Sequence, residues 1–357
     1  MKKLLFLSLM AAIYACSNDL EPNIENTDKI GWRTLPKYTI PYQYPSGYVE
    51  TEVSSNLTTW STGATASQNT SKYGTTSSIY EINSRIITIY QNTSNQLRSV
   101  EYVDGPNQWT IPSVVSTATS PLLPTIENQD GTLYEAHASV PDITGQFVKG
   151  NTRTGYASNW SSTYNLKSGG GAGSNIPTNY SPSLEYHANS GGVLFLITAV
   201  INHSTNLGVP GVYWRYNTSN FTSTTAPTIS LGTSDPTELN ASICPIAVGD
   251  ELWLFYTIPG SSSQSELVIK YVKATISGSG SGAISGSWSS PTSVSGAYTN
   301  HKIDGFYDSS SQKIVLVFQN YSTGYIDLAI SGDFGSTWDL SVTGIASTNG
   351  APSIAHL

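Results

Sequence analysis

Four residues that can exchange protons lie in or beside short apolar segments of the second half of the chain. They are Glu185, Glu238, Asp304 and, three residues before Asp304, His301. Two carboxylates on either side of a glycosidic bond can hydrolyse it, one as an acid and the other as a nucleophile or base. An isolated acid, in Thr-Glu-Leu-Asn or Lys-Ile-Asp-Gly, is more typical of a solvated or turn-capping side chain. Catalysis therefore requires a fold that brings these residues together.

The elements that would position these acids belong to a repeated all-β unit. From about residue 38 onward, short Val/Ile/Tyr/Phe segments alternate with Gly, Ser, Asn and Pro turns, and no segment keeps a helical apolar period. Each unit ends in a polar turn with an aromatic residue. These aromatic residues lie 49 to 67 residues apart, which is typical of four-stranded β-propeller blades: Trp60, Trp109, Trp160, Phe221, Trp288 and Trp338.

Each unit begins with an inner strand that is followed by a more hydrophobic second strand, as expected where blades cover both faces of a sheet. The predicted inner strands are 77–82, 122–127, 183–187, 242–247, 302–307 and 352–357, and the predicted second strands are 85–91, 132–139, 193–200, 251–258 and 313–319.

The last inner strand, 352–357, has no second strand after it, whereas three segments near the N-terminus (38–44, 48–54 and 57–61) have no inner strand. We therefore predict a six-bladed β-propeller whose ring closes with one C-terminal and three N-terminal strands. Closure leaves no open sheet edge. The alternative, two stacked β-sandwiches, predicts unrelated halves instead of a recurring unit.

Composition excludes several classes of function. Lys and Arg total 16 against 24 Asp and Glu, a net charge of −8 without a basic stripe, which argues against nucleic-acid binding. Two cysteines cannot form a disulfide framework or a four-thiolate zinc site. Cys244 is flanked by apolar residues and is expected to be a buried free thiol. No cofactor or metal is expected.

The N-terminus reads MKKLLFLSLMAAIYAC, a basic start followed by an apolar run that is typical of a secretory signal peptide. The ending Ile-Tyr-Ala-Cys resembles a bacterial lipobox, which implies diacylation of Cys16. The acidic segment after Cys16 resembles an export signal to the outer surface. We expect a signal peptide over 1–15, a lipidated tether over 16–36, the propeller over 37–357, and a location at the bacterial outer membrane or cell surface.

Residues 331–338 read Ser-Gly-Asp-Phe-Gly-Ser-Thr-Trp and match the Asp-box pattern Ser-x-Asp-x-Gly-x-Thr-Trp at each specified position. This resembles the blade turn of sialidases and related BNR-repeat proteins, where the box is structural. In this turn the Asp333 carboxylate can accept backbone N–H bonds, Gly335 permits a left-handed backbone and Trp338 packs between sheets. Ser331 and Thr337 complete the motif.

Sialidases of this family use an arginine triad, a Tyr–Glu nucleophile pair and an Asp acid. This chain has five arginines in all, and none begins a predicted inner strand, where side chains could converge on a channel. Sialidase activity is therefore disfavoured, while hydrolysis of other sugars by two carboxylates stays open. On that hypothesis Glu185, Glu238, Asp304 and His301 form the catalytic cluster.

Residues 78–109 resemble one repeat of the six-bladed fucose-binding lectins, which bind a sugar with an Arg, a Glu and an aromatic residue. The resemblance implies that Arg85, Arg98 and Trp109 contact a sugar, although Ser99 stands where the lectin's Glu is expected. The leading hypothesis is a monomeric, lipid-anchored propeller that binds a glycan. The alternatives are a glycoside hydrolase and a protein-binding scaffold that uses the loops 202–211 and 140–153.

Overall fold

The computed structural model describes residues 35–67, 71–81, 85–103, 108–116, 124–129, 131–139, 147–154, 158–168, 174–178, 181–188, 190, 194–204, 207–215, 222–225, 229–230, 242–260, 266–277, 284 and 287–357. These residues lie within one unit, Leu35–Leu357, and their regular elements are all β-strands. None of the described segments forms a helix long and apolar enough to cross a membrane.

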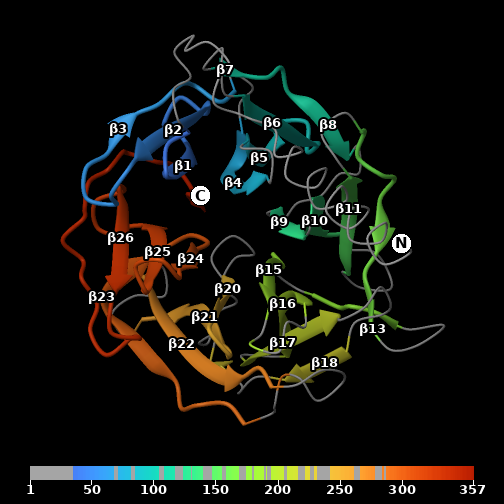
Figure 1. The fold of residues 1–357 in the computed structure, drawn as a ribbon, viewed down its shortest axis with the longest axis vertical. Helices are drawn as coiled ribbons and strands as arrows, with labels where there is room; N and C mark the ends of the chain where they lie inside the picture. Colours follow the sequence, from blue (N-terminus) through green and yellow to red (C-terminus); the bar gives the residue numbers. More distant parts are fainter. Residues whose placement is uncertain are drawn as a thin grey trace, which may run out of the picture. The chain divides into compact units, whose positions relative to one another are not determined.

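Six antiparallel sheets surround a common centre, and one strand of each sheet lies innermost (Figure 1). We number these sheets as blades 1 to 6 in the order of their inner strands along the chain. The inner strands are β4 (Ser71–Glu81), β9 (Thr125–Gln129), β15 (Ser183–Ala188), β20 (Ile243–Val248), β24 (Asp304–Asp308) and β27 (Ala355–His356).

Blades 1 to 3 continue outward in chain order from their inner strands. Blade 1 adds β5 (Arg85–Asn92), β6 (Leu97–Val103), β7 (Gln108–Trp109) and β8 (Ser113–Ser116); blade 2 adds β10 (Thr132–Ala138), β11 (Val148–Thr154) and β12 (Tyr164–Asn165); and blade 3 adds β16 (Leu194–Ser204), β17 (Leu207–Arg215), β18 (Thr222–Thr225) and β19 (Ile229–Ser230). The short strands β13 (Lys167–Ser168) and β14 (Ser174–Asn175) pair with each other.

Blades 4 to 6 complete the ring. Blade 4 adds β21 (Glu251–Pro259), β22 (Leu267–Thr275) and β23 (Thr292–Thr299); blade 5 adds β25 (Lys313–Gln319) and β26 (Ile326–Ser331); and blade 6 adds β1 (Tyr38–Gln43), β2 (Val49–Ser54) and β3 (Ser61–Thr62).

Blade 6 is made from both ends of the chain, as predicted. Tyr38 of β1 pairs with His356 of β27, and Thr39 pairs with Ala355. A side-chain link supports this closure, because Lys37 Nζ and the Tyr38 hydroxyl lie 3.1 and 3.0 Å from Asp308 Oδ2 at the end of β24. The predicted six-bladed, all-β propeller is confirmed.

The outer edges of the blades are less regular than the predicted four strands. Blade 5 has three strands, because the segment outside β26 contacts it only at separated positions, such as Ile330 with Asp339 and Tyr325 with Ser347. In blades 1 and 3 the outer edge is broken into two short strands that pair with the same neighbour. The outer edge is the least enclosed part of a blade, so irregular strands are tolerated there.

The second strands carry the core, because each is covered by a blade on either side. In β25, every residue after Lys313 is buried, and in β21 the segment from Leu252 to Thr257 is buried. Buried apolar side chains cluster between all six pairs of neighbouring blades. Between blades 4 and 5 the rings of Trp253 and Tyr271 stack with centroids 4.9 Å apart. This burial is the main stabilising term of the ring.

The turn after β26 has the geometry that its sequence predicts. Asp333 Oδ1 accepts the backbone N–H of Thr337 at 2.9 Å, and Asp333 Oδ2 accepts its hydroxyl at 2.6 Å. Gly335 has a φ of 80°. Trp338 packs against the cluster between blades 4 and 5. The turn thus stabilises the edge of blade 5.

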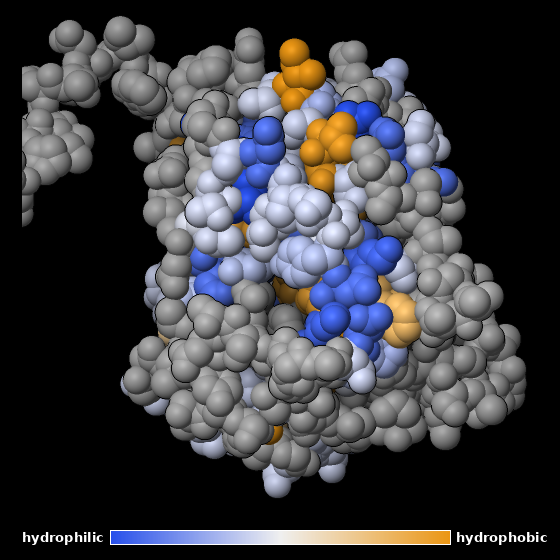
Figure 2. Space-filling view, turned by 90° about the vertical axis from the view of Figure 1, so that its right-hand side faces the viewer, coloured by the Kyte–Doolittle hydropathy of each residue, from blue (hydrophilic) through white to orange (hydrophobic). Residues whose placement is uncertain are grey.

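Hydrophobic residues are scattered over one side of the molecule. Figure 2 shows the side of the molecule that carries β8 and β11, where the described residues are mainly hydrophilic or intermediate and hydrophobic ones are scattered. The most exposed large hydrophobic side chain among the described residues is Ile111, at 91% of its full accessibility. Scattered apolar residues of this kind are ordinary for a protein surface.

Candidate functional site

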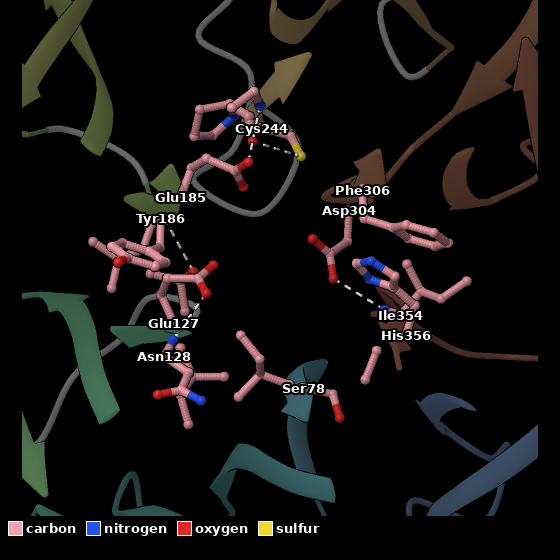
Figure 3. A pocket seen from close by; sticks show the side chains of 18 of the residues that line it. Ser78, Glu127, Asn128, Glu185, Tyr186, Cys244, Asp304, Phe306, Ile354 and His356 are labelled. Carbon is pink, nitrogen blue, oxygen red and sulfur yellow. Dashed lines mark hydrogen bonds between the residues drawn. The ribbon is translucent and has the colours of Figure 1, made fainter. Parts of the chain in front are cut away.

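A cavity of about 340 Å³ lies where the inner strands meet, and residues of all six blades line it. Its volume is in the range of small-molecule sites. The lining includes acids, amides and hydroxyls together with aromatic rings, and Figure 3 shows these side chains around the cavity.

Three carboxylates from three blades point into this cavity (Figure 3). Glu127 and Glu185 come from the neighbouring strands β9 and β15, and Asp304 lies across from them on β24. Each is half-buried and accepts a backbone N–H bond. Glu127 Oε1 accepts from Asn128 at 2.8 Å, Glu185 Oε1 from Ala247 at 2.9 Å, and Asp304 Oδ2 from Ile354 at 3.0 Å.

Burial makes these acids hard to ionise. It raises the pKa of Glu127 to about 8, an effect that the charge of Asp304 increases. The pKa of Glu185 is raised well above its usual value by burial and then by the charge of Glu127. Burial also raises the pKa of Asp304, although Lys302 opposes this shift. Near neutral pH the cavity therefore holds carboxyl groups that can donate as well as accept a hydrogen bond.

Aromatic rings lie beside the acids. The His356 and Phe306 rings stack with centroids 3.9 Å apart and an angle of 14° between their planes. Tyr186 also lines the cavity. Burial lowers the pKa of His356 to about 4 and also lowers that of His187, so both imidazoles are neutral near pH 7.

Two histidines of the inner strands, His187 in β15 and His356 in β27, also belong to this site. Both line the cavity, and His187 Nε2 is buried without a hydrogen-bond partner among the described residues. Cys244 is the buried free thiol that was predicted, and it too lines the cavity. Burial raises the pKa of its thiol well above the usual value.

The structure brings together two of the four predicted acid–base residues. Glu185 and Asp304 line the same cavity, whereas Glu238 lies outside the described residues. His301 does not line the cavity, because it lies in the connection before β24, outside the inner strand itself. Its imidazole is half-buried, and burial lowers its pKa to about 4.

Glu127 was missed as a candidate, although a signal for it is present in the sequence. Within each inner strand, or directly at its start, three residues follow one pattern: a buried first residue, then an Ile or a Leu, then a variable third residue. The described third side chains all line the cavity. The six triplets are Ser78-Ile79-Tyr80, Thr125-Ile126-Glu127, Ser183-Leu184-Glu185, Ser242-Ile243-Cys244, Lys302-Ile303-Asp304 and Ser353-Ile354-Ala355.

The predicted sugar-contacting residues Arg85, Arg98 and Trp109 belong to blade 1, away from the central cavity. Arg85 Nη1 lies 3.3 Å from Glu101 Oε2, and the other Glu101 oxygen contacts Arg153 of blade 2.

Arg98 donates to Gln96 Oε1 at 2.7 Å, and the Trp109 ring packs edge-on against Tyr102. Blade 1 therefore does place an arginine beside a glutamate, although the acid is Glu101 instead of residue 99.

A second cavity, of about 360 Å³, lies at the outer edge between blades 5 and 6. Its lining includes Trp60, Ser341 and Thr343 and no charged residue. Acids thus distinguish the central cavity from this outer one. Among the residues that the structure describes, no group of three or more His, Cys, Asp or Glu side chains could hold a metal ion.

Comparison with known structures supports the architecture. The chain is similar to the fucose-specific lectin from Aleuria aurantia, with a TM-score of 0.55 and 11% identity over 85% of this chain and 90% of the lectin. Another structure of that lectin, described as a six-bladed β-propeller with a novel fucose recognition mode, gives 0.52, 12% identity, and 85% and 89% coverage. The fold is that of a six-bladed β-propeller.

A Hadza microbial sialidase is similar too, with a TM-score of 0.50 and 10% identity over 87% of this chain and 74% of the sialidase. No protein-family model matches the chain, and no curated protein matches it. Identities this low establish a shared fold, and they assign neither a ligand nor an activity.

Proposed function

We propose that this propeller binds a carbohydrate in its central cavity. The observation that carries the proposal is the convergence of three half-buried carboxyl groups with the rings of Tyr186 and Phe306 in one cavity. Sugars present hydroxyls at their edges and C–H groups on their faces, so they need both kinds of lining. The fold likeness to a fucose-specific lectin and to a sialidase is in keeping with this function.

A glycan array tests the proposal, with the full chain compared with Glu185→Gln and Arg98→Ala. We expect glycan binding that Glu185→Gln weakens and Arg98→Ala leaves unchanged. Loss of binding in Arg98→Ala alone would move the site to blade 1, where Arg85 and Trp109 are also predicted to contact sugar. No binding by the full chain would overturn the proposal and favour the protein-binding scaffold.

Glycoside hydrolysis is a second candidate, and one observation favours it. Glu127 is held protonated near neutral pH, as a general acid must be, and Asp304 faces it across the cavity (Figure 3). A panel of chromogenic glycosides tests this. Turnover that Glu127→Gln and Asp304→Asn both abolish would support the enzyme, whereas glycan binding without any turnover would exclude it for the sugars tested.

We further propose that the chain is exported and anchored through a lipidated Cys16, a residue outside the described part of the structure. The support is the lipobox-like ending of the apolar N-terminal segment. Metabolic labelling with a fatty-acid analogue should mark the wild-type chain and fail to mark Cys16→Ser. Equal labelling of both chains, or labelling of neither, would refute the anchor.

A further inference from the structure

We infer that the sugar bound in the central cavity carries a positively charged amino group. This inference rests on the proposed carbohydrate function, and it adds the class of sugar. It depends on the lining of the cavity, on the partners of its carboxylates and on the absence of a basic side chain from the described wall.

The described wall offers carboxyl groups, which a ligand cation can ionise, and no basic side chain that is charged near pH 7. Among the described lining residues there is no Lys or Arg, and burial keeps the two imidazoles neutral near pH 7. The described lining of β4 contributes Ser78 and Ile79, which do not ionise. The ionisable side chains of the described lining are Glu127 from β9, Glu185, Tyr186 and His187 from β15, Cys244 from β20, Asp304 and Tyr307 from β24, and His356 from β27.

One of the three acids has a basic neighbour, and the other two do not. The buried Lys302 interacts electrostatically with Asp304 and donates to the Pro124 carbonyl at 3.4 Å. Neither Glu127 nor Glu185 forms an ion pair with a described Lys or Arg side chain. Glu127 accepts hydrogen bonds from the backbone N–H groups of Asn128 and Tyr186, and Glu185 accepts one from that of Ala247.

A ligand ammonium would complete this arrangement. It has three N–H donors, and Glu127 and Glu185 offer several acceptor lone pairs on the same side of the cavity (Figure 3). Burying an unpaired carboxylate is costly, whereas a paired and hydrogen-bonded one is tolerated. An anionic sugar would face the opposite situation, because three acids and no arginine would meet its carboxylate. The cavity therefore selects an amino sugar over an acidic one.

Three disaccharides with the same linkage separate the possibilities in calorimetric titrations of the full chain near pH 6. They are the β1-4 dimer of glucosamine, its N-acetylated form and cellobiose. We expect the glucosamine dimer to bind about tenfold or more tightly than the two uncharged sugars. Its binding should also release protons from the protein, seen as an enthalpy that depends on the buffer, because the ammonium favours ionised carboxylates.

Glu127→Gln and Glu185→Gln should each remove most of this preference, because each should weaken binding of the glucosamine dimer more than binding of cellobiose. Glu251→Gln is the matched control, since its carboxylate is exposed and lies outside the cavity. Thermal unfolding of each variant shows whether it is folded.

Equal binding of the charged and uncharged sugars, or tight binding without proton release, would overturn this inference and leave the proposed function standing. Absence of binding by all three, together with a silent glycan array, would overturn both.

Discussion

Ionisable side chains are buried in two places, and the two groups differ in how acids and bases are combined. The central cavity gathers acids without a full complement of bases, whereas the contact between blades 1 and 2 places Glu101 between Arg85 and Arg153. The first arrangement raises pKa values and suits a ligand. The second pairs one carboxylate with an arginine from each of two blades and suits the attachment of one blade to the next.

The cavity acids should make stability depend on pH. Because the pKa of folded Glu127 is about 8 and that of an unfolded Glu is about 4.5, the folded state keeps a proton that the unfolded state loses between these values. The free energy of unfolding should therefore fall as the pH rises from about 5 to about 8, by up to about 1.4 kcal/mol per pH unit. Urea titrations at several pH values should show a shallower fall in Glu127→Gln than in Glu251→Gln.

An unchanged slope in Glu127→Gln would show that other groups hold the proton. Glu185 would then be the next carboxyl to test, since its pKa is raised in the same direction and partly by Glu127 itself.

Glu101 should contribute strongly to stability, because its loss leaves two arginines facing each other. The Arg153 and Glu101 side chains are 6% and 9% exposed, so solvent cannot replace the missing partner. Glu101→Gln should lower the free energy of unfolding by about 3 kcal/mol in chemical denaturation. Glu251→Gln breaks a half-exposed pair with Lys273 and should cost less than about 1 kcal/mol. Equal costs would refute the role of burial.

At the scale of elements, successive inner strands are joined by side chains as well as by packing. Thr125 Oγ1 accepts the N–H of Leu184 at 3.2 Å, and Ser242 Oγ accepts the N–H of Ile303 at 3.0 Å. Glu185 and Asp304 form the same kind of link to the following blade. Two of the cavity acids therefore position strands as well as facing a ligand.

The turn of residues 331–338 allows a matched test of backbone conformation. A Cβ on Gly335 would require a strained φ of 80° and would lie 2.7 Å from the Tyr271 hydroxyl and 2.8 Å from the Trp253 ring. Gly335→Ala should therefore destabilise the protein by at least ~1 kcal/mol. Gly332→Ala, in the same turn, meets nothing within 4 Å and should be close to neutral. Thermal melts that fail to separate the two variants would contradict this account.

Strand positions were predictable from sequence because the second strands are long, apolar and bounded by turn residues. The predicted 313–319 coincides with β25, and the predicted 85–91 falls one residue short of β5. Outer edges were harder to predict, since short polar strands such as β3 and β12 resemble turns. The site was predictable in part: Glu185 and Asp304 follow from the inner-strand positions, whereas Glu127 required the six triplets to be aligned with one another.

At the scale of the whole molecule, the two ends of the chain form one blade, so the ring depends on its last residues. Ile354 and Ala355 are 4% and 2% exposed, and both line the cavity. The contact of Ile354 with Asp304 links the C-terminal strand directly to a cavity acid.

Deletion of residues 354–357 should therefore destabilise the whole ring and expose the edge of β1, with a lower melting temperature and aggregation in size-exclusion chromatography. Deletion of Leu357 alone removes a residue that is 61% exposed and should have a much smaller effect. Identical behaviour of the two truncated chains would show that β27 is dispensable for closure.

Closure through β27 also determines at which point of synthesis the ring can be completed. Ribosomes make the three other strands of blade 6 first and the strand that completes them last, about three hundred residues later. Blades 1 to 5 can form while the chain is still emerging, but the N-terminal strands must wait for the final residues. Until then the cavity lacks the part of its wall that Ile354, Ala355 and His356 form. A nascent or truncated chain therefore has no complete binding site.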